Sequence, residues 1–175
     1  MTNIKEKVSY KTKWRIVRYA NEEDVRLRRL YAEEEALRLF GAPQVSEVEG
    51  NLLLNEGINA LWTILCSSGG TKFDNTNAYL GVGDSSAAES ASQTGLQGTN
   101  KTYKGMDTGF PTYGTSQKAT WRATFGSSDG NHGWNEFTVA NGNSDSATNL
   151  NRKVSAQGTK VSGQTWQLTL EISLA

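Results

Sequence analysis

Residues 51–85 decide the fold of this chain and read NLLLNEGINALWTILCSSGGTKFDNTNAYLGVGDS. In the first half, apolar side chains recur at intervals of four, three, one and three residues, which is the spacing of an amphipathic helix. The members of this stripe are Leu54, Ile58, Leu61, Trp62 and Leu65. In the second half, the apolar run 78–82 is bounded by Asn and Gly and predicts a strand.

The central helix is expected to span roughly residues 52–67 and to cover one side or end of a β-rich body. Gly57 inside it costs about 1 kcal/mol of helix propensity relative to Ala. We therefore expect another part of the chain to approach the backbone closely at Gly57. Cys66, near the end of the helix, is expected to be a small buried hydrophobe, because a lone cysteine more often packs than reacts.

The later part of the chain alternates between apolar and polar side chains, as half-buried strands do. The final segment, 165–175, places one apolar set on a single face: Trp166, Leu168, Leu170, Ile172 and Leu174. Segment 118–125 shows the same alternation, 134–140 is expected to form the next strand, and 151–155 is expected to form a weaker one. Residues 83–114 are expected to form long surface loops with one short strand. The fold class that follows is mainly β, an antiparallel β-sandwich or jelly-roll-like body with one central helix.

The first fifty residues differ in composition, because they hold ten of the eighteen basic residues. The segment Val8–Tyr19 alternates like a strand with an exposed basic face. Asn21 is a suitable N-cap for a helix that Gly41 would end. We interpret the chain as two parts: a charged N-terminal arm of a strand and a helix, residues 1–50, and a β-rich body domain, residues 51–175.

Two interpretations of the arm remain open. Its strand either presents a solvated basic face that protects an edge, or pairs with a neighbouring subunit. Its helix has a narrow apolar stripe, which suits docking on its own body or on a partner. In the second interpretation the partner-binding residues are Val8, Tyr10, Trp14, Ile16, Leu30, Leu37 and Phe40.

Composition argues against several classes of partner. Eighteen basic residues balance eighteen acidic residues, whereas phosphate binding needs a basic excess, so we expect no nucleic acid partner. The N-terminus lacks the apolar region of a secretory signal, and no apolar stretch is long enough to span a membrane. One cysteine excludes an intramolecular disulfide, and one cysteine with one histidine excludes the usual zinc sites.

Three patterns invite a chemical interpretation. Residues 126–130, GSSDG, match the G-x-S-x-G nucleophile pattern, but that motif needs a strand, a turn and then a helix. Here the only histidine, His132, lies in the same predicted hairpin turn. Asp74 and Asp129 with nearby asparagines resemble calcium ligands, and Asx turns explain them equally well. Trp121, Trp134 and Trp166 suit either sugar binding or core packing, and their alternation favours packing. We expect no enzyme activity, no metal and no cofactor.

Four segments carry a resemblance to a known family: NLLLNEGINALWTIL, AYLGVGDSSAAESASQTGLQG, ATWRATFGSSDGNHGWNEFTVANG and LNRKVSAQGTKVSGQTWQLTLEISL. In this order they resemble a family of tailed-bacteriophage virion proteins over the part of the chain that begins at residue 51. The charged first fifty residues lie outside the resemblance.

The resemblance implies a small, β-rich, non-enzymatic structural protein of a bacteriophage particle, located in the virion after assembly in the host cytoplasm. The first expectation is a capsid decoration (cement) protein that binds the major capsid protein lattice. The alternatives are a tail, fibre or head–tail connector component, or a carbohydrate-binding module of the virion. The implied partners are other virion proteins, either the major capsid protein or tail proteins, together with further copies of this chain.

Overall fold

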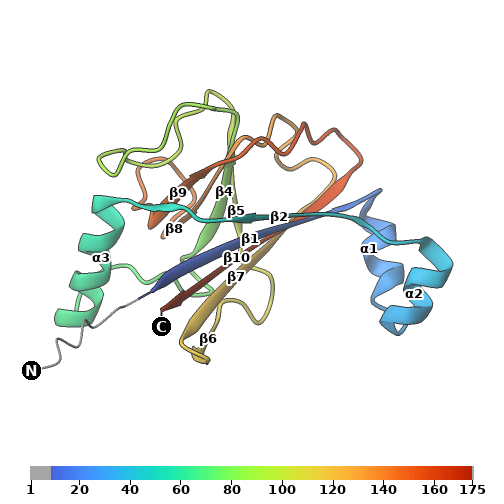
Figure 1. Ribbon diagram of the computed structural model, residues 1–175, viewed down its shortest axis with the longest axis horizontal. Coiled ribbons are helices and arrows are strands. Elements are labelled where there is room, and N and C mark those ends of the chain that lie inside the picture. Colours follow the sequence, from blue (N-terminus) through green and yellow to red (C-terminus); the bar gives the residue numbers. More distant parts are fainter. Residues whose placement is uncertain (1–8, 175) are drawn as a thin grey trace, which may run out of the picture.

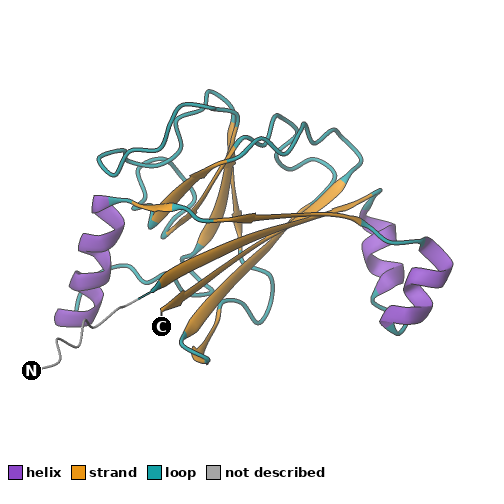
Figure 2. Ribbon diagram, viewed as in Figure 1, coloured by secondary structure: helices purple, strands orange, loops and turns teal. Residues whose placement is uncertain are grey.

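The computed structural model describes residues 9–174, which form two antiparallel sheets and three short helices (Figures 1 and 2). The first sheet has the strand order β2–β1–β10–β7–β6, and the second has the order β3–β9–β8–β4–β5. The helices lie outside the sheets, with α3 at one end of the long axis and α1 and α2 at the other (Figure 1). The predicted mainly β, sandwich-like body with a central helix is confirmed.

The first sheet is built around β1 (Tyr10–Tyr19) and β10 (Thr165–Leu174), which pair along their whole length. The register places Trp14 opposite Leu170 and Ile16 opposite Leu168, so the two alternating apolar sets share one face. On the far side of β10 lies β7 (Lys118–Phe125), followed by the short edge strand β6 (Thr112–Thr115). The other edge is β2 (Gln44–Glu49).

The second sheet has the two-residue edge strand β3 (Leu52–Leu53), then β9 (Asn151–Val154) and β8 (Glu136–Ala140). It continues through β4 (Tyr79–Gly83) to the other edge, β5 (Lys101–Gly105). Every residue of β8 is buried, which gives it the continuous rather than alternating burial of a central strand. Residues 83–114, expected to be loops with one short strand, contain β5 and the first three residues of β6.

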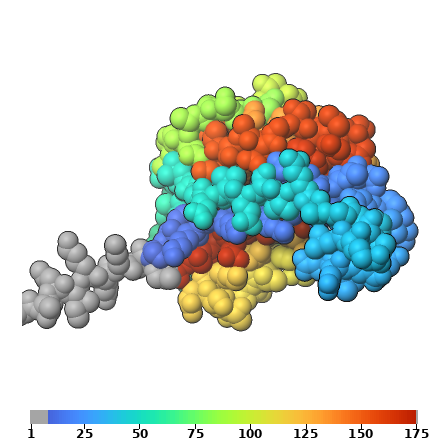
Figure 3. All heavy atoms as spheres, turned by 45° about the vertical axis from the view of Figure 1, so that its right-hand side comes forward, coloured from blue at the N-terminus to red at the C-terminus, as the bar shows by residue number. Residues whose placement is uncertain are grey.

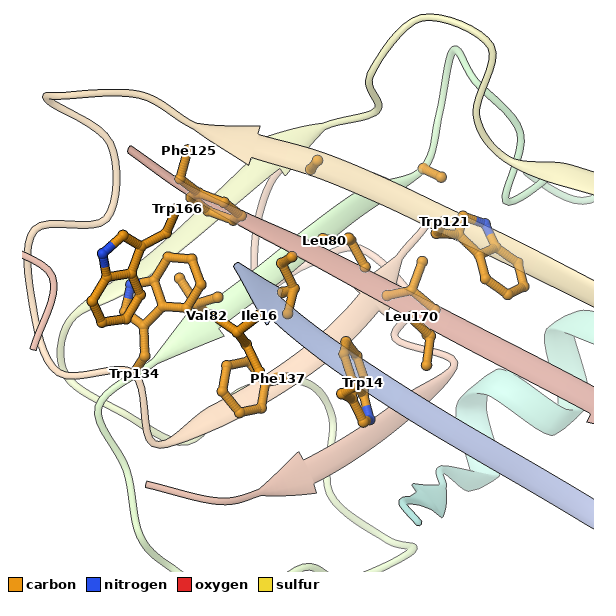
Figure 4. Close-up of a cluster of buried hydrophobic side chains, with 14 of the residues drawn as sticks. Trp14, Ile16, Leu80, Val82, Trp121, Phe125, Trp134, Phe137, Trp166 and Leu170 are labelled. Atoms are coloured by element: carbon orange, nitrogen blue, oxygen red, sulfur yellow. The ribbon is translucent and has the colours of Figure 1, made fainter. Parts of the chain in front are cut away.

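An aromatic cluster joins the two sheets in the core (Figure 4). The Trp134 ring meets the rings of Phe125 and Trp166 edge-on, at centroid distances of 4.8 and 4.9 Å. The ring of Phe137 on β8 lies 5.6 Å from that of Trp14 on β1. Such tilted and edge-on pairs add to the area they bury by about 0.5–1.5 kcal/mol each. Trp121, Trp134 and Trp166 are therefore core residues.

A buried ion pair anchors the long loop 84–100 to the second sheet. The carboxylate of Glu136 on β8 accepts from Arg152 on β9 at 2.7 Å, and both side chains are fully buried. Glu136 also accepts from the backbone N–H groups of Gln97 and Gly98. Arg152 in turn donates to the carbonyl of Ala87 within the same loop. One charged pair thus contacts the loop near its start and near its end.

The helix α3 (Asn55–Cys66) is shorter at its start than the predicted 52–67 because Leu52–Leu53 pair with β9 as β3. The expected close approach at Gly57 is present. A Cβ on Gly57 would lie 2.4 Å from the carbonyl oxygen of Leu150, so only glycine fits. The expectation of a buried Cys66 is wrong, because the helix ends with this residue exposed.

The single helix predicted from Asn21 to Gly41 is instead two helices, α1 (Glu22–Arg28) and α2 (Glu33–Phe40). The predicted caps are present: the Asn21 side chain accepts from Asp24 N, and Gly41 ends α2 at a φ of 69°. The chain turns between the helices, so that the Arg28 guanidinium donates to the carbonyls of Phe40 and Gly41. The α1–α2 hairpin forms a lobe on one side of the body (Figure 3).

Residues 10–49 supply two of the five strands of the first sheet, β1 and β2. The strand half of the expected arm is therefore part of the sandwich, because β1 lies between β2 and β10 rather than at a free edge. Only the helical half, α1 and α2, projects from the body (Figures 1 and 3). A boundary at residue 50 thus falls between β2 and β3, where the chain passes from one sheet to the other.

Candidate functional site: exposed apolar helical faces

The candidate partner-binding residues separate into three groups in the structure. Trp14 and Ile16 are fully buried in the core of their own chain, so the expectation that they contact a neighbouring subunit is corrected. The reason is the position of β1, whose apolar face closes the sandwich against the second sheet. Val8 lies outside the described residues.

Tyr10 is half-buried at the start of β1, and its hydroxyl donates to Asn51 Oδ1 at 2.7 Å. Burial disfavours the phenolate and raises the pKa of Tyr10 to about 12, against a smaller lowering by the hydrogen bond to Asn51. The hydroxyl is therefore a neutral donor at physiological pH. It joins the first strand to the connection between the two sheets.

Leu30, Leu37 and Phe40 lie together at the α1–α2 end of the molecule. Leu30 is 65% exposed and Leu37 is 43% exposed. Phe40 is half-buried and packs against Tyr31 at a centroid distance of 5.9 Å. We call the exposed apolar residues of this hairpin the α1–α2 patch: Leu30, Tyr31, Leu37 and Leu39.

The outer side of α3 carries a second exposed apolar surface, which the candidate list drawn from the sequence omits. Leu61, Trp62 and Leu65 are 43%, 59% and 74% exposed, and Ile58 beside them is half-buried. We call these four residues the α3 seam. The side of the helix that meets the core is formed instead by Gly57, Ala60 and Ile64.

The signal for the α3 seam is present in the sequence as the stripe Ile58, Leu61, Trp62 and Leu65. Taken alone, such a stripe predicts a face that packs on the body of its own chain. The structure shows that smaller residues take that place, because Gly57 lets the helix backbone touch Leu150. Leu54, at the start of the predicted stripe, is buried, whereas Leu61, Trp62 and Leu65 are turned toward solvent.

The segment 126–130 forms a turn between β7 and β8 rather than a strand-to-helix elbow. Ser127 donates from its N–H and its hydroxyl to Glu22, which fixes this turn to α1. The ring nitrogens of His132 lie 3.0 Å from Thr102 Oγ1 and 2.9 Å from the Gly133 carbonyl oxygen. The residues that match the nucleophile motif therefore form a hydrogen-bonded turn.

Two lysines, Lys104 and Lys160, donate hydrogen bonds to the same turn. Asp129 accepts from Lys104 Nζ at 2.6 Å, and this hydrogen bond is the main reason that the pKa of Asp129 is lowered. Lys160 is buried and donates to the Gly126 carbonyl and to Asn131 Oδ1 at 2.7 and 2.8 Å. Burial lowers the pKa of Lys160, whereas Asp129 and Glu22 oppose that shift. These groups stabilise backbone geometry and face no reactive partner.

The oxygen-rich group at Asp74 is an Asx turn. Asp74 Oδ1 accepts from the N–H groups of Thr76 and Asn77 and from the Asn77 side chain. Within residues 9–174 no group of three or more His, Cys, Asp and Glu side chains is arranged to hold a metal ion. Over the same residues, no helix has the length and apolar character needed to cross a membrane.

The comparisons with known proteins find no significant similarity. No family model matches the chain, and neither the curated proteins nor the solved structures contain a significant match.

Proposed function

We propose that this chain is a non-enzymatic structural protein of a bacteriophage particle, and first of all a capsid decoration protein that binds the major capsid protein lattice. The proposal draws on the resemblance of the segments after residue 51 to tailed-bacteriophage virion proteins. Its cellular setting is the virion, assembled in the host cytoplasm. Its partners are other virion proteins and further copies of the chain.

The observation that carries this proposal is the pair of exposed apolar helical surfaces, the α3 seam and the α1–α2 patch. They lie at opposite ends of the long axis, on either side of a well-packed sandwich (Figure 1). Apolar side chains that are grouped on the surface of a folded protein mark contact sites more often than scattered ones do. A rigid body with a contact surface at each end is suited to joining neighbours in an array.

The sandwich itself supports a structural rather than a chemical role. In the 126–131 turn, Ser127, Asp129 and Asn131 make hydrogen bonds that hold the turn in place, and Gly98 of loop 84–100 is bound to Glu136. The three tryptophans considered for sugar binding are in the core. A carbohydrate module would have to use other aromatic residues.

The test is to measure the copy number and position of the chain in purified particles of the phage that encodes it. Quantitative mass spectrometry would normalise this chain to the major capsid protein, and cryo-electron microscopy would locate it. Many copies over the shell are expected for a decoration protein. A few copies at one vertex would instead identify a tail, fibre or connector component. Absence from the particles would overturn the proposal.

A further inference from the structure

We propose that the α3 seam is a self-association surface, on which the α3 seam of a second copy of this chain packs across a two-fold axis. The biological role of this contact rests on the proposed function, because assembly in a particle brings copies of the chain together. Its test uses the purified chain alone. The two proposals can therefore fail separately.

Within residues 9–174, the sandwich cannot bury the seam. The contact of Gly57 with Leu150 fixes the rotation of α3, because a Cβ at Gly57 would already lie 2.4 Å from the Leu150 carbonyl oxygen. Turning the helix to bring Trp62 to the sandwich would move larger side chains into that contact. The side of α3 that faces away from the sandwich is thus fixed by this contact.

The seam has the spacing of a helix–helix contact. Ile58, Leu61, Trp62 and Leu65 follow one another at intervals of three, one and three residues, which places them on one stripe about two turns long. Apolar residues at this spacing on two helices interdigitate when the helices cross at a small angle. An identical seam supplies a partner with the same spacing.

Charge does not oppose a second copy as the occupant. Glu56 is the only charged side chain of α3, and its carboxylate accepts from the N–H of Asn149 at 2.9 Å, away from the seam. Partners that are selected by charge meet complementary charges around the contact, and like charges oppose self-pairing. The uncharged α3 seam meets no such repulsion from its own copy. The α1–α2 patch differs, since α2 carries Glu33, Glu34, Glu35 and Arg38.

The size of the seam sets the expected strength. Three partly exposed side chains bury on the order of 300 Å² per copy, judged from the area of aromatic and leucine side chains. A stable stand-alone interface buries about 800 Å² per partner. The pairing should therefore be weak in dilute solution and become persistent where a scaffold holds copies near each other, because tethering raises the effective concentration.

The first experiment is sedimentation equilibrium of the purified full chain, under reducing conditions, from micromolar to millimolar concentration. We expect a reversible monomer–dimer equilibrium that Leu65→Asp weakens at least tenfold. Leu30→Asp is the matched control, since Leu30 is a similarly exposed leucine at the other end of the molecule. A wild-type chain that remains monomeric at millimolar concentration would overturn the proposal. Equal weakening by both substitutions would also overturn it.

The second experiment maps the contact by cross-linking in a Cys66→Ser background, because Cys66 is exposed beside the seam. Leu61→Cys places a thiol at the middle of the seam, where it faces its own copy in either relative direction of the helices. Thr63→Cys is the control, an exposed position of α3 that points away from the seam. We expect disulfide-linked dimers from Leu61→Cys at least five times faster than from Thr63→Cys. Equal rates would place the contact elsewhere.

A particle assay separates this inference from the proposed function. A monomeric chain whose Leu65→Asp variant no longer enters particles would mean that a different virion protein covers the seam, so self-pairing fails while the structural role stands. A chain that dimerises through α3 but is absent from particles would leave self-pairing in place and overturn the proposed function.

Discussion

Trp134 and Trp62 mark the difference between the sandwich and its helical ends. Trp134 is fully buried and meets three aromatic rings, whereas Trp62 on α3 is 59% exposed. The same contrast separates β1 from the α1–α2 hairpin that follows it directly in sequence. Trp14 and Ile16 are in the core, and Leu30 and Leu37 are on the surface.

This difference indicates where the stability of the fold resides. Burial of large apolar side chains is the main favourable contribution to folding, and in this molecule it is concentrated between the two sheets. The exposed residues of α3 and of the α1–α2 hairpin contribute little to the folded chain, so their apolar character is available for contacts. Substitutions in the two regions should therefore have opposite consequences for folding and for association.

The largest expected effect comes from deleting β1. A chain that starts at Val48 should not fold, because it loses Trp14 and Ile16 from the core and leaves β10 without one of its two neighbours in the sheet. Circular dichroism and a thermal melt should show no cooperative transition. A truncated chain that folds would instead support the interpretation of residues 51–175 as a body domain separate from the arm.

The matched deletion removes only the helical hairpin. A short Gly/Ser linker from Tyr19 to Gln44 can replace α1 and α2, because Arg18 and Gln44 are paired in adjacent antiparallel strands. This variant should fold with a cooperative melt. A hairpin deletion that unfolds as completely as the truncation at Val48 would contradict the division into sandwich and helical ends.

The second prediction compares the two faces of β10. Leu168→Asp should prevent folding, because Leu168 is fully buried and an unpaired charge there costs several kcal/mol. Thr169→Asp is the control, since Thr169 faces the other way and lies between Arg15 and Arg122 in register. Its free energy of unfolding should change by less than about 0.5 kcal/mol. A soluble Leu168→Asp chain with an unchanged melting temperature would show that this face of β10 is not part of the core.

The strands could be predicted from the sequence because alternation has a single structural meaning in a sheet with one buried face. The segments 165–174 and 118–125 illustrate this, and each pairs with a neighbour along that alternation. The role of β1 could not be predicted as firmly. An exposed basic face describes one side of a strand and does not show whether the other side closes its own core or a neighbour's.

The helices were harder to place for a different physical reason. The sequence pattern identifies which residues of α3 share a face, but the direction of that face depends on which backbone the helix touches. Gly57 signals a close approach and does not name Leu150 as the neighbour. The hairpin between α1 and α2 likewise depends on Arg28 reaching the carbonyls of Phe40 and Gly41, which are distant in sequence.

The third prediction compares a buried ion pair with an exposed one. Glu136→Ala should lower the free energy of unfolding by about 3–5 kcal/mol, because it leaves the fully buried Arg152 without its carboxylate. Glu171→Ala removes the partner of Lys118 in an ion pair whose two side chains are both partly exposed, and it should cost less than about 1 kcal/mol. Urea denaturation would measure both. Hydrogen exchange should also show faster exchange of the Gln97 and Gly98 N–H groups in Glu136→Ala, since both donate to the missing carboxylate. Equal costs for the two substitutions would contradict this assignment.

The smallest expected effect is the response of the 126–131 turn to acid. The hydrogen bond from Lys104 is the main cause of the lowered pKa of Asp129 in the folded chain. A carboxyl group with a lower pKa when folded contributes stability above its unfolded pKa of about 4, and this contribution is lost as the pH falls through the folded pKa. The group is partly exposed, so the contribution should be below about 1 kcal/mol. Asp129→Asn should therefore lower the melting temperature slightly at pH 7 and have less effect near pH 2.

Glu23→Gln is the control at the helical end. The pKa of Glu23 is lowered through its hydrogen bond from Arg26, but both side chains are more than half exposed, so the substitution should not change the melting temperature at either pH. A larger acid effect from Glu23→Gln than from Asp129→Asn would mean that the α1–α2 hairpin contributes more to global stability than the sandwich turn it contacts through Ser127.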